Sequence, residues 1–446
     1  METELRLTEE LFVIPDTERY YLYAPLKGSV VEGNGGLIDL LKRLGQGMPP
    51  SEEELPLVEQ LVRRRMLMPA GKKRVCDETA VVYEPVAVTF LPTYDCNLRC
   101  TYCYARGGED VGPQLSWDAA KAAIDLIMAN AEKHGSKQVA IGFHGGGEPL
   151  LPRNMPLIKR CVEYARDETQ KLSMKLRVSS PTNGVVRKQD LEWVLENFEH
   201  LNISLDGPPD IQNAQRPMPY GRPSSDRVRA TVDTLEERKF DYGIRATITG
   251  DSVARMAEIV EYFHSISSRK AFHLEPLFEC GRCRTTKTAA PSPADFLRYS
   301  REARQTAESL GVNIHYSGAR MDGVSNCFCG AAGRNFFVTP DARVTTCLEA
   351  SRPDEGMAAV FDIGAYDAGK KCYSFDMARI GKLQQRTVGN MPHCADCFAK
   401  YNCSGDCLAK VYAQSGSLVD ASNNSRCDVN RNLLLDTIKG RLQSNR

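Results

Sequence analysis

The sequence predicts an α/β protein built on a partial (β/α)6 barrel, with a small winged-helix domain before it and an irregular, cysteine-rich domain after it. Three observations lead to this fold class. Short apolar strands alternate with helical stretches from about residue 86, the first 80 residues carry a strand and helix pattern of their own, and nine of the sixteen cysteines lie at or beyond Cys327. We therefore expect three domains, at residues 1–80, 81–318 and 319–446.

The N-terminal segment shows short alternating strand patterns followed by two amphipathic helices. The strands are expected at residues 11–14, 20–23 and 29–32, and the helices at 36–45 and 54–67. Pro69 and Gly71 close the second helix. This order of elements is typical of a winged-helix module, and a charged linker at 71–80 leads away from it.

The central segment repeats a strand and a helix six times, which is the signature of parallel strands joined by crossover helices. The strands are expected at residues 86–91, 138–143, 175–180, 200–205, 242–249 and 271–277. The helices are expected to begin near Trp117, Met155, Lys188, Asp226, Ser252 and Pro293. In such barrels the reactive groups lie at the carboxyl ends of the strands.

Composition excludes several classes of protein. Basic and acidic residues balance at 57 each and there are two tryptophans, so nothing predicts a nucleic-acid partner. No secretory signal or membrane-spanning stretch is found, so we expect a cytoplasmic protein that does not contact a membrane. Sixteen cysteines in that reducing compartment favour metal binding over disulfides.

The strongest motif is Cys-x3-Cys-x2-Cys, formed by Cys96, Cys100 and Cys103 directly after the first barrel strand. Three thiolates on one loop can bind three irons of a four-iron cubane and leave the fourth iron open. Zinc is the alternative, but a structural zinc site needs four closed ligands. After the second strand comes Gly145-Gly146-Gly147-Glu148-Pro149, where the glycines permit close backbone approach.

The cysteine loop, with Tyr102 before its last cysteine, resembles the defining motif of the radical S-adenosylmethionine (SAM) superfamily. The resemblance implies that the open iron chelates SAM and that electron transfer into the cluster yields a 5′-deoxyadenosyl radical. It implies these cofactor-binding residues: Tyr102, Gly146, Gly147, Glu148, Asn183, Ser204, Asp206, Arg216 and Arg245. The arginines could instead form ordinary salt bridges, and Asp206 could be a turn residue. His144 is a pocket wall or a core histidine, and no catalytic acid or base is identified.

The C-terminal cysteines resemble the SPASM domain, an extension that carries auxiliary clusters. The resemblance assigns an outer cluster to Cys394, Cys397, Cys403 and Cys427, and an inner one to Cys329, Cys347, Cys407 and, as fourth ligand, Cys327. Cys280, Cys283 or an open position compete with Cys327, and a zinc knuckle is the alternative for the outer set. Ala342 stands where the family has glycine. Cys76, Cys161 and Cys372 have no partner at ligand spacing and are expected to be idle thiols.

The N-terminal segment resembles the peptide-recognition element of ribosomal-peptide maturases, which binds a leader peptide as an added strand. Residues 29–32 and the helix 54–66 would form the groove, although Arg63, Arg64 and Arg65 keep a dimerisation or DNA-binding module open. The whole chain then resembles a SPASM maturase with SAM and three [4Fe-4S] clusters. It would form a thioether or carbon–carbon crosslink in a precursor peptide, with flavodoxin or ferredoxin as electron donor. The alternatives are sulfatase-maturase-like oxidation of a protein side chain and a non-enzymatic electron-transfer protein.

Overall fold

The computed structural model describes residues 5–17, 19–69, 82–109, 111–321, 323–353 and 356–444. Contacts group the chain into two compact units. Unit 1 comprises Met1–Ala80, Ser317–Phe328 and Arg386–Arg446, and unit 2 comprises Val81–Tyr316 and Cys329–Gln385. The predicted linker at 71–80, with Cys76, lies outside the described residues. No helix in the described ranges is long and apolar enough to cross a membrane.

Unit 2 contains the predicted barrel. Its parallel strands follow one another in sequence order, and all six predicted strands are present with one more at the end. The strands are β6 (Ala87–Phe90), β7 (Gln138–Phe143), β8 (Lys175–Thr182), β9 (His200–Ser204), β10 (Tyr242–Ile248), β11 (Ala271–Pro276) and β12 (Asn313–His315). Their alternating apolar residues are buried under helices.

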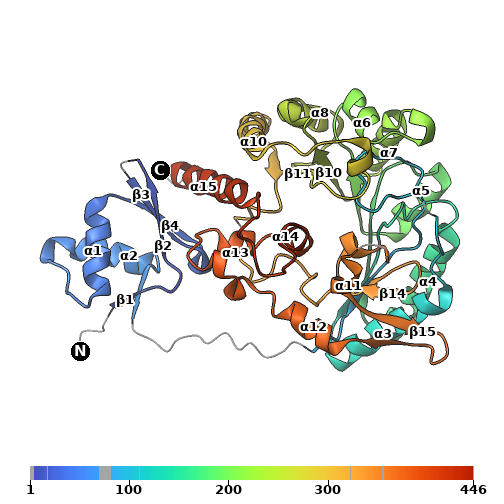
Figure 1. Cartoon of the computed structure of the whole chain (residues 1–446), viewed down its shortest axis with the longest axis horizontal. Coiled ribbons are helices and arrows are strands. Elements are labelled where there is room, and N and C mark those ends of the chain that lie inside the picture. Colours follow the sequence, from blue (N-terminus) through green and yellow to red (C-terminus); the bar gives the residue numbers. More distant parts are fainter. Residues whose placement is uncertain are drawn as a thin grey trace. The chain divides into compact units, whose positions relative to one another are not determined.

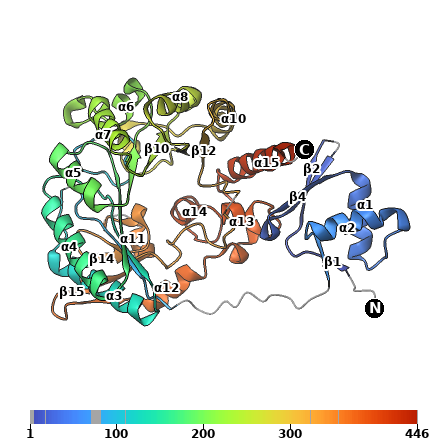
Figure 2. The ribbon, with the colours of Figure 1, turned by 180° about the vertical axis from the view of Figure 1, so that it is seen from behind.

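Four helices of unit 2 begin where the sequence predicts, whereas the helix expected from Asp226 begins one residue earlier and the helix expected from Ser252 four residues later than predicted. The helices cover the outside of the parallel strands in both views (Figure 1 and Figure 2). They are α3 (Trp117–Lys133), α4 (Met155–Lys171), α5 (Lys188–Asn197), α7 (Ser225–Glu237), α8 (Met256–Ile266) and α10 (Pro293–Ser309). Ser116 and Ser292 cap α3 and α10 by accepting backbone N–H groups. Two short helices were not predicted, α6 (Pro209–Gln215) and α9 (Cys283–Thr286).

The segment after the barrel is more regular than the sequence predicts. Four strands extend the barrel sheet beyond β6 to eleven strands, and β13 joins β6 in parallel while the rest are antiparallel. They are β13 (Phe337–Val338), β14 (Arg343–Thr345), β15 (Asp362–Asp367) and β16 (Cys372–Phe375), with helices α11 (Ala358–Phe361) and α12 (Met377–Gln384). β13 and β14, with two and three residues, are too short for their periodicity to be read from sequence, and β15 and β16 were not predicted either.

Unit 1 begins with a three-stranded antiparallel sheet in the order β2-β3-β4, as the alternation predicts. Its elements are β2 (Phe12–Asp16), β3 (Arg19–Ala24), β4 (Ser29–Gly33), α1 (Gly35–Gly45) and α2 (Leu55–Arg63). The second helix ends earlier than predicted, because Arg65 adopts a left-handed φ of 57° that stops the helix. The chain then forms β5 (Leu67–Pro69), which pairs with β1 (Leu5–Leu7). The winged-helix assignment stays a prediction.

The N-terminal sheet packs against the C-terminal helices within unit 1. One core joins the sheet to α1 and α2, with Leu22, Leu40 and Leu61 at its centre. A second core joins Tyr23 to Leu434 on the last helix, which lies beside the sheet in Figure 1. These C-terminal helices are α13 (Lys400–Cys403), α14 (Leu408–Ser415) and α15 (Cys427–Ser444). Contacts therefore group residues 1–80 with the end of the chain, and the three-domain division stays a prediction.

Candidate active site

The cysteine loop, residues 96–103, follows β6 at the end of the barrel where parallel strands present reactive groups. Burial raises the pKa of the Cys96 thiol, and nearby Cys100 and Cys103 raise it further, so the three sulfurs lie together. Each sulfur accepts N–H donors. The donors are the Leu98 backbone (3.4 Å) and the Asn183 amide (3.7 Å) to Cys96, Arg216 (3.8 Å) to Cys100, and the Gly107 backbone (3.4 Å) to Cys103.

This donor set fits an iron–sulfur cluster. Burial raises the pKa of Cys100 to about 11, so its thiolate forms readily only if a metal replaces the proton. N–H groups directed at cysteine sulfurs stabilise the anionic charge of such clusters. Cys96, Cys100 and Cys103 would hold three irons, and no fourth cysteine lies on the loop.

The glycine run packs against the cysteine loop so closely that side chains are excluded. A Cβ on Gly147 would lie 1.8 Å from the carbonyl oxygen of Asp95, and one on Gly146 would lie 2.5 Å from the ring of Tyr94. The backbone N–H of Glu148 donates to the same Asp95 carbonyl at 2.8 Å. Glycine is therefore required here for close approach to the loop, in agreement with the role proposed from sequence.

Glu148 and Asn183 connect the glycine run to the cysteine loop. The buried Glu148 carboxylate accepts from the backbone N–H of Asn183 (2.8 Å), the hydroxyl of Thr182 (2.8 Å) and the backbone of Leu150 (3.0 Å). The Asn183 amide donates to Asn97 at 2.8 Å. Both residues thus hold the loop in place, and their contacts with SAM stay predictions.

Asp206 holds two residues of the predicted cofactor pocket. Its carboxylate, which is completely buried, accepts from the Tyr102 hydroxyl at 2.6 Å and lies 3.1 Å from Arg216 Nε. Gln215 (2.7 Å) and the backbone of Thr247 (3.0 Å) also donate to it. Because Oδ2 accepts two hydrogen bonds and Oδ1 accepts one while also facing Arg216, the geometry favours a positioning role, and direct contact with SAM stays a prediction.

Ser204 and Arg245 lie side by side at paired positions of β9 and β10. Arg245 is exposed and points away from the buried face of β10, which Ile244 and Ala246 form. Its contact with the cofactor, like that of Ser204, stays a prediction. Burial lowers the pKa of His144 to about 4, and the Gly145 N–H donates to its Nδ1 at 2.8 Å, so this imidazole stays neutral at pH 7.

Two arginines that hold the cysteine loop were not identified from the sequence. Arg282 is buried, donates to the carbonyls of Cys100 (2.9 Å) and Gly107 (2.7 Å), and pairs with Glu109. Arg352 donates to the carbonyl of Ala105 at 2.5 Å. Both come from segments far away in sequence and bind backbone atoms, so no local pattern could have revealed them.

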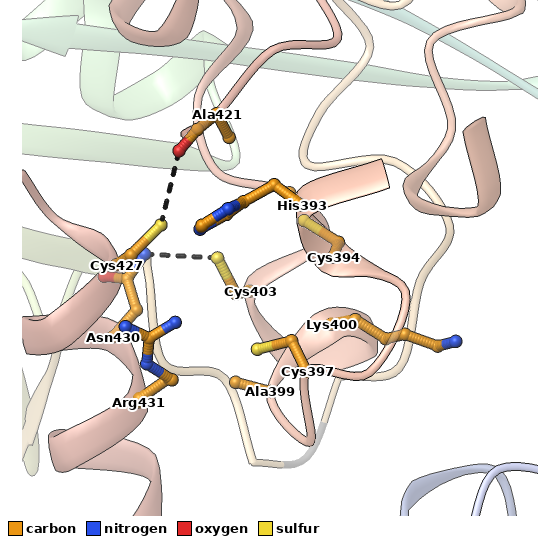
Figure 3. Close-up of a pocket in the computed structure, with 11 residues that line it drawn as sticks. His393, Cys394, Cys397, Ala399, Lys400, Cys403, Ala421, Cys427, Asn430 and Arg431 are labelled. Atoms are coloured by element: carbon orange, nitrogen blue, oxygen red, sulfur yellow. Dashed lines mark hydrogen bonds between the residues drawn. The ribbon is translucent and has the colours of Figure 1, made fainter. Parts of the chain in front are cut away.

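The four cysteines assigned to the outer cluster line one cavity in unit 1. We call it the four-cysteine cavity: Cys394, Cys397, Cys403 and Cys427 (Figure 3). Among the described residues, no three histidine, cysteine, aspartate or glutamate side chains converge closely enough to hold a single metal ion. Four cysteine thiolates are the usual donor set of a [4Fe-4S] cluster and also of a closed zinc site, so the outer cluster stays a prediction.

The predicted inner set is divided between the two units. Cys329 and Cys347 belong to unit 2, and Cys327 and Cys407 to unit 1, so the inner cluster stays a prediction. The Cys327 thiol donates to the carbonyl of Arg386 at 3.5 Å. Cys161 is buried in α4 and Cys372 is exposed on β16, and their assignment as idle thiols stays a prediction.

Alanine forms the turn at the position where the predicted SPASM pattern has glycine. Ala342 lies between β13 and β14 and adopts a left-handed φ of 60°. Its N–H donates to the carbonyl of Thr339 at 2.9 Å, which closes the turn. The substitution therefore keeps the turn at the cost of backbone strain.

Comparison with known proteins identifies the class. Residues 90–263 match the family model of the radical SAM superfamily. This range includes the cysteine loop, the glycine run and Asp206. The chain therefore contains a radical SAM domain.

Within that class the chain is related to sulfatase-maturating enzymes. It is 24% identical to the serine-type anaerobic sulfatase-maturating enzyme of Klebsiella aerogenes over 74% of this chain and 80% of that one. For several other curated relatives, the match spans only about half of the relative's length.

Two solved structures share the fold. The enzyme anSMEcpe, solved with S-adenosylmethionine and the Cp18Cys peptide, is 16% identical with a TM-score of 0.61 and covers 81% of this chain and 100% of that one. Streptococcus suis SuiB, solved bound to its precursor peptide SuiA, is 14% identical with a TM-score of 0.50 and covers 93% of this chain and 98% of that one.

Proposed function

We propose that this protein is a radical SAM maturase that modifies a ribosomally made precursor peptide by forming a thioether or carbon–carbon crosslink. The observation that carries the proposal is the cysteine loop, whose three sulfurs each receive N–H donors while the glycine run lies against the loop. With SAM bound, the cluster would supply hydrogen-atom abstraction. Flavodoxin or ferredoxin is the proposed electron donor, in a reducing cytoplasm where none of the described cysteines needs a disulfide.

Different residues are proposed to bind the cluster, position the loop and bind the cofactor. Cys96, Cys100 and Cys103 would hold the cluster, and Gly146 and Gly147, which let the backbone lie close to the segment before the cysteine loop, are proposed to bind the cofactor. Asp206 orients Tyr102 and Arg216 beside the loop. Ser204 and Arg245 are proposed to bind the cofactor's carboxylate or ribose, since an arginine can grip a carboxylate with two N–H groups.

Peptide recognition is assigned to unit 1. β4 is an edge strand of its sheet, because within the described ranges it pairs only with β3. An edge strand offers backbone N–H and C=O groups to which an extended leader peptide can add. The likeness of the chain to SuiB, a structure solved with its precursor peptide, supports a peptide as substrate.

The recognition step is tested with proline substitutions on the two edges of the same sheet. Val31 on β4 and Val13 on β2 both lie opposite Leu22 of the central strand. Because N–H directions alternate along a strand, Val30→Pro and Val31→Pro are made separately, and one of them removes an outward donor. We expect one of these variants to weaken leader binding at least tenfold in fluorescence anisotropy, while Val13→Pro leaves it unchanged. Equal affinities in all folded variants would exclude the β4 edge.

The second candidate is oxidation of a protein side chain, as in sulfatase maturation. The observation that favours it is the Klebsiella aerogenes relative, whose match extends over most of both chains. The two functions differ in product. Tandem mass spectrometry of a treated precursor peptide would show linked fragments for a crosslink, and a modified but unlinked residue for side-chain oxidation.

A further inference from the structure

Arg386 is a completely buried cation without a carboxylate partner. Its guanidinium donates only to backbone carbonyls, and no ion pair joins it to any described acidic residue. The acceptors are Leu418 (3.1 Å), Ser404 (2.9 Å), Gly405 (2.5 Å) and Asp406 (3.2 Å). A buried charge that meets neutral groups alone is costly, so such a residue calls for a nearby anion.

Arg386 lies directly behind the wall of the four-cysteine cavity. Gly405 lines that cavity, and a Cβ on Gly405 would lie 2.6 Å from Arg386 Nη1. Burial lowers the pKa of Arg386, while Cys394 and Cys403 act most strongly to raise it again. The Asp406 carboxylate raises it as well but already pairs with Arg426, so the unpaired negative charge that could face this guanidinium is on the cysteines of the cavity.

The other charged groups around the cavity are already paired. Asp406 lies 3.0 Å from Arg426, and Lys400 lies 2.7 Å from Glu10. On the open side of the cavity, Arg431 pairs with the exposed Asp428 at 2.6 Å. Arg386 is therefore the surplus positive charge at this site.

A second residue, Asn430, donates a hydrogen bond directly to a cysteine sulfur of the cavity. The side-chain amide of Asn430, in the first turn of α15, donates to Cys403 Sγ at 3.1 Å (Figure 3). Hydrogen bonds to cysteine sulfurs and nearby positive charge both favour the more negative, reduced form of a cluster. Asn430 and Arg386 thus act in the same direction from two sides of Cys403.

We propose that Arg386 is the built-in counter-charge of an anionic cluster in the four-cysteine cavity and, together with Asn430, raises the reduction potential of that cluster. The inference rests on the auxiliary cluster of the proposed function. Four thiolates around a [4Fe-4S] core carry net negative charge, and reduction by one electron adds one more. Arg386 is a positioning residue in this role, because it acts on the cluster through the cavity wall.

The test is an EPR-monitored potentiometric titration, with dithionite as reductant, of the anaerobically reconstituted full chain. The outer couple is identified as the one missing from Cys397→Ala. We expect Arg386→Gln, which keeps a donor but loses the charge, to lower the reduced-to-oxidised ratio of this couple at least tenfold at a fixed potential. For a one-electron couple this is a shift of about 59 mV. Asn430→Leu should shift the potential in the same direction by a smaller amount.

Arg431→Gln is the matched control. Its side chain lines the same cavity but is 36% exposed, so water screens its charge. We expect Arg431→Gln to shift the reduction potential by less than a third of the shift in Arg386→Gln. Equal shifts in the two variants would overturn the proposal, and so would an unchanged potential in Arg386→Gln. If Arg386→Gln does not fold, Arg386→Lys replaces it in the test, because lysine keeps the positive charge and should leave the potential nearly unchanged. A folded lysine variant whose reduced-to-oxidised ratio changes tenfold would contradict the role of charge. If the Cys397→Ala variant contains as much iron as the wild-type protein, the auxiliary cluster itself is refuted.

Discussion

The cysteine loop and the four-cysteine cavity both present cysteine thiols, but they differ in the number of thiols and in the groups that surround them. The loop places three cysteines within eight residues after one strand, and backbone and side-chain N–H groups reach every sulfur. The cavity gathers four cysteines from residues 394 to 427 and has a buried cation behind it. The first arrangement leaves one position open for a ligand, and the second can close a cluster completely. The comparison predicts chemistry at the loop and electron handling at the cavity.

The largest expected effect separates the two sites by their reactions. Replacing Cys96, Cys100 and Cys103 together by alanine should abolish reductive cleavage of SAM, because only this loop leaves an iron open. Cys397→Ala should retain cleavage and lose peptide product. Cys372→Ala, an exposed thiol outside both sites, is the control and should retain both activities. Chromatographic detection of 5′-deoxyadenosine in the triple variant would show that the site is misplaced.

A second effect concerns the buried carboxylate that holds the loop. Asp206→Asn removes the charge that faces Arg216 and should destabilise unit 2 by roughly 3–5 kcal/mol, the usual cost of breaking a buried ion pair. Asp210→Asn is the matched control, because its pair with Arg255 is exposed and contributes about 0–1 kcal/mol. Chemical denaturation followed by circular dichroism measures both. Equal losses in the two variants would mean that burial of the pair does not matter.

A third effect is a dependence of stability on pH. Burial lowers the pKa of His144 from 6.5 to about 4, so between these pH values the imidazole is protonated in the unfolded chain and neutral in the folded chain. Stability should therefore fall as pH drops from 6.5 toward 4, by roughly 2 kcal/mol between pH 7 and pH 5. His144→Gln should remove this part of the slope. An unchanged slope in melting temperature against pH would contradict a buried neutral imidazole.

The smallest effect concerns the strained turn beside the barrel. Ala342→Gly should stabilise unit 2 by about 1 kcal/mol, because glycine adopts the left-handed φ of 60° without a Cβ clash. Ala230→Gly, in the regular helix α7, should have the opposite sign. Melting temperatures of the two variants check this, and destabilisation by Ala342→Gly would show that the turn is not strained.

The barrel could be predicted because its signals are local. Each strand is a short apolar run, and four of the six helices begin at the residue that the pattern indicates, as at Trp117 and Lys188. The cysteine loop and the glycine run were found for the same reason. Both are contiguous motifs whose chemistry can be read from one segment of the chain.

The supporting residues could not be predicted, because they act across long sequence distances. Arg282 reaches the loop from about 180 residues away, and Arg386 binds carbonyls in a turn that no periodicity marks. The packing of α15 on the N-terminal sheet was missed as well. It means that removing residues 1–75 would strip the core of Tyr23 and Leu434, so point substitutions on β4 test leader binding more cleanly than truncation.

The central claim is that this chain carries separate iron–sulfur sites in a loop and in a cavity, and iron and sulfide analysis tests it most directly. Anaerobically reconstituted wild-type protein should contain about twelve irons per chain, about eight after replacement of Cys96, Cys100 and Cys103, and about eight after replacement of Cys394 and Cys397. A wild-type content of about four irons, or zinc in place of the outer iron, would contradict the account.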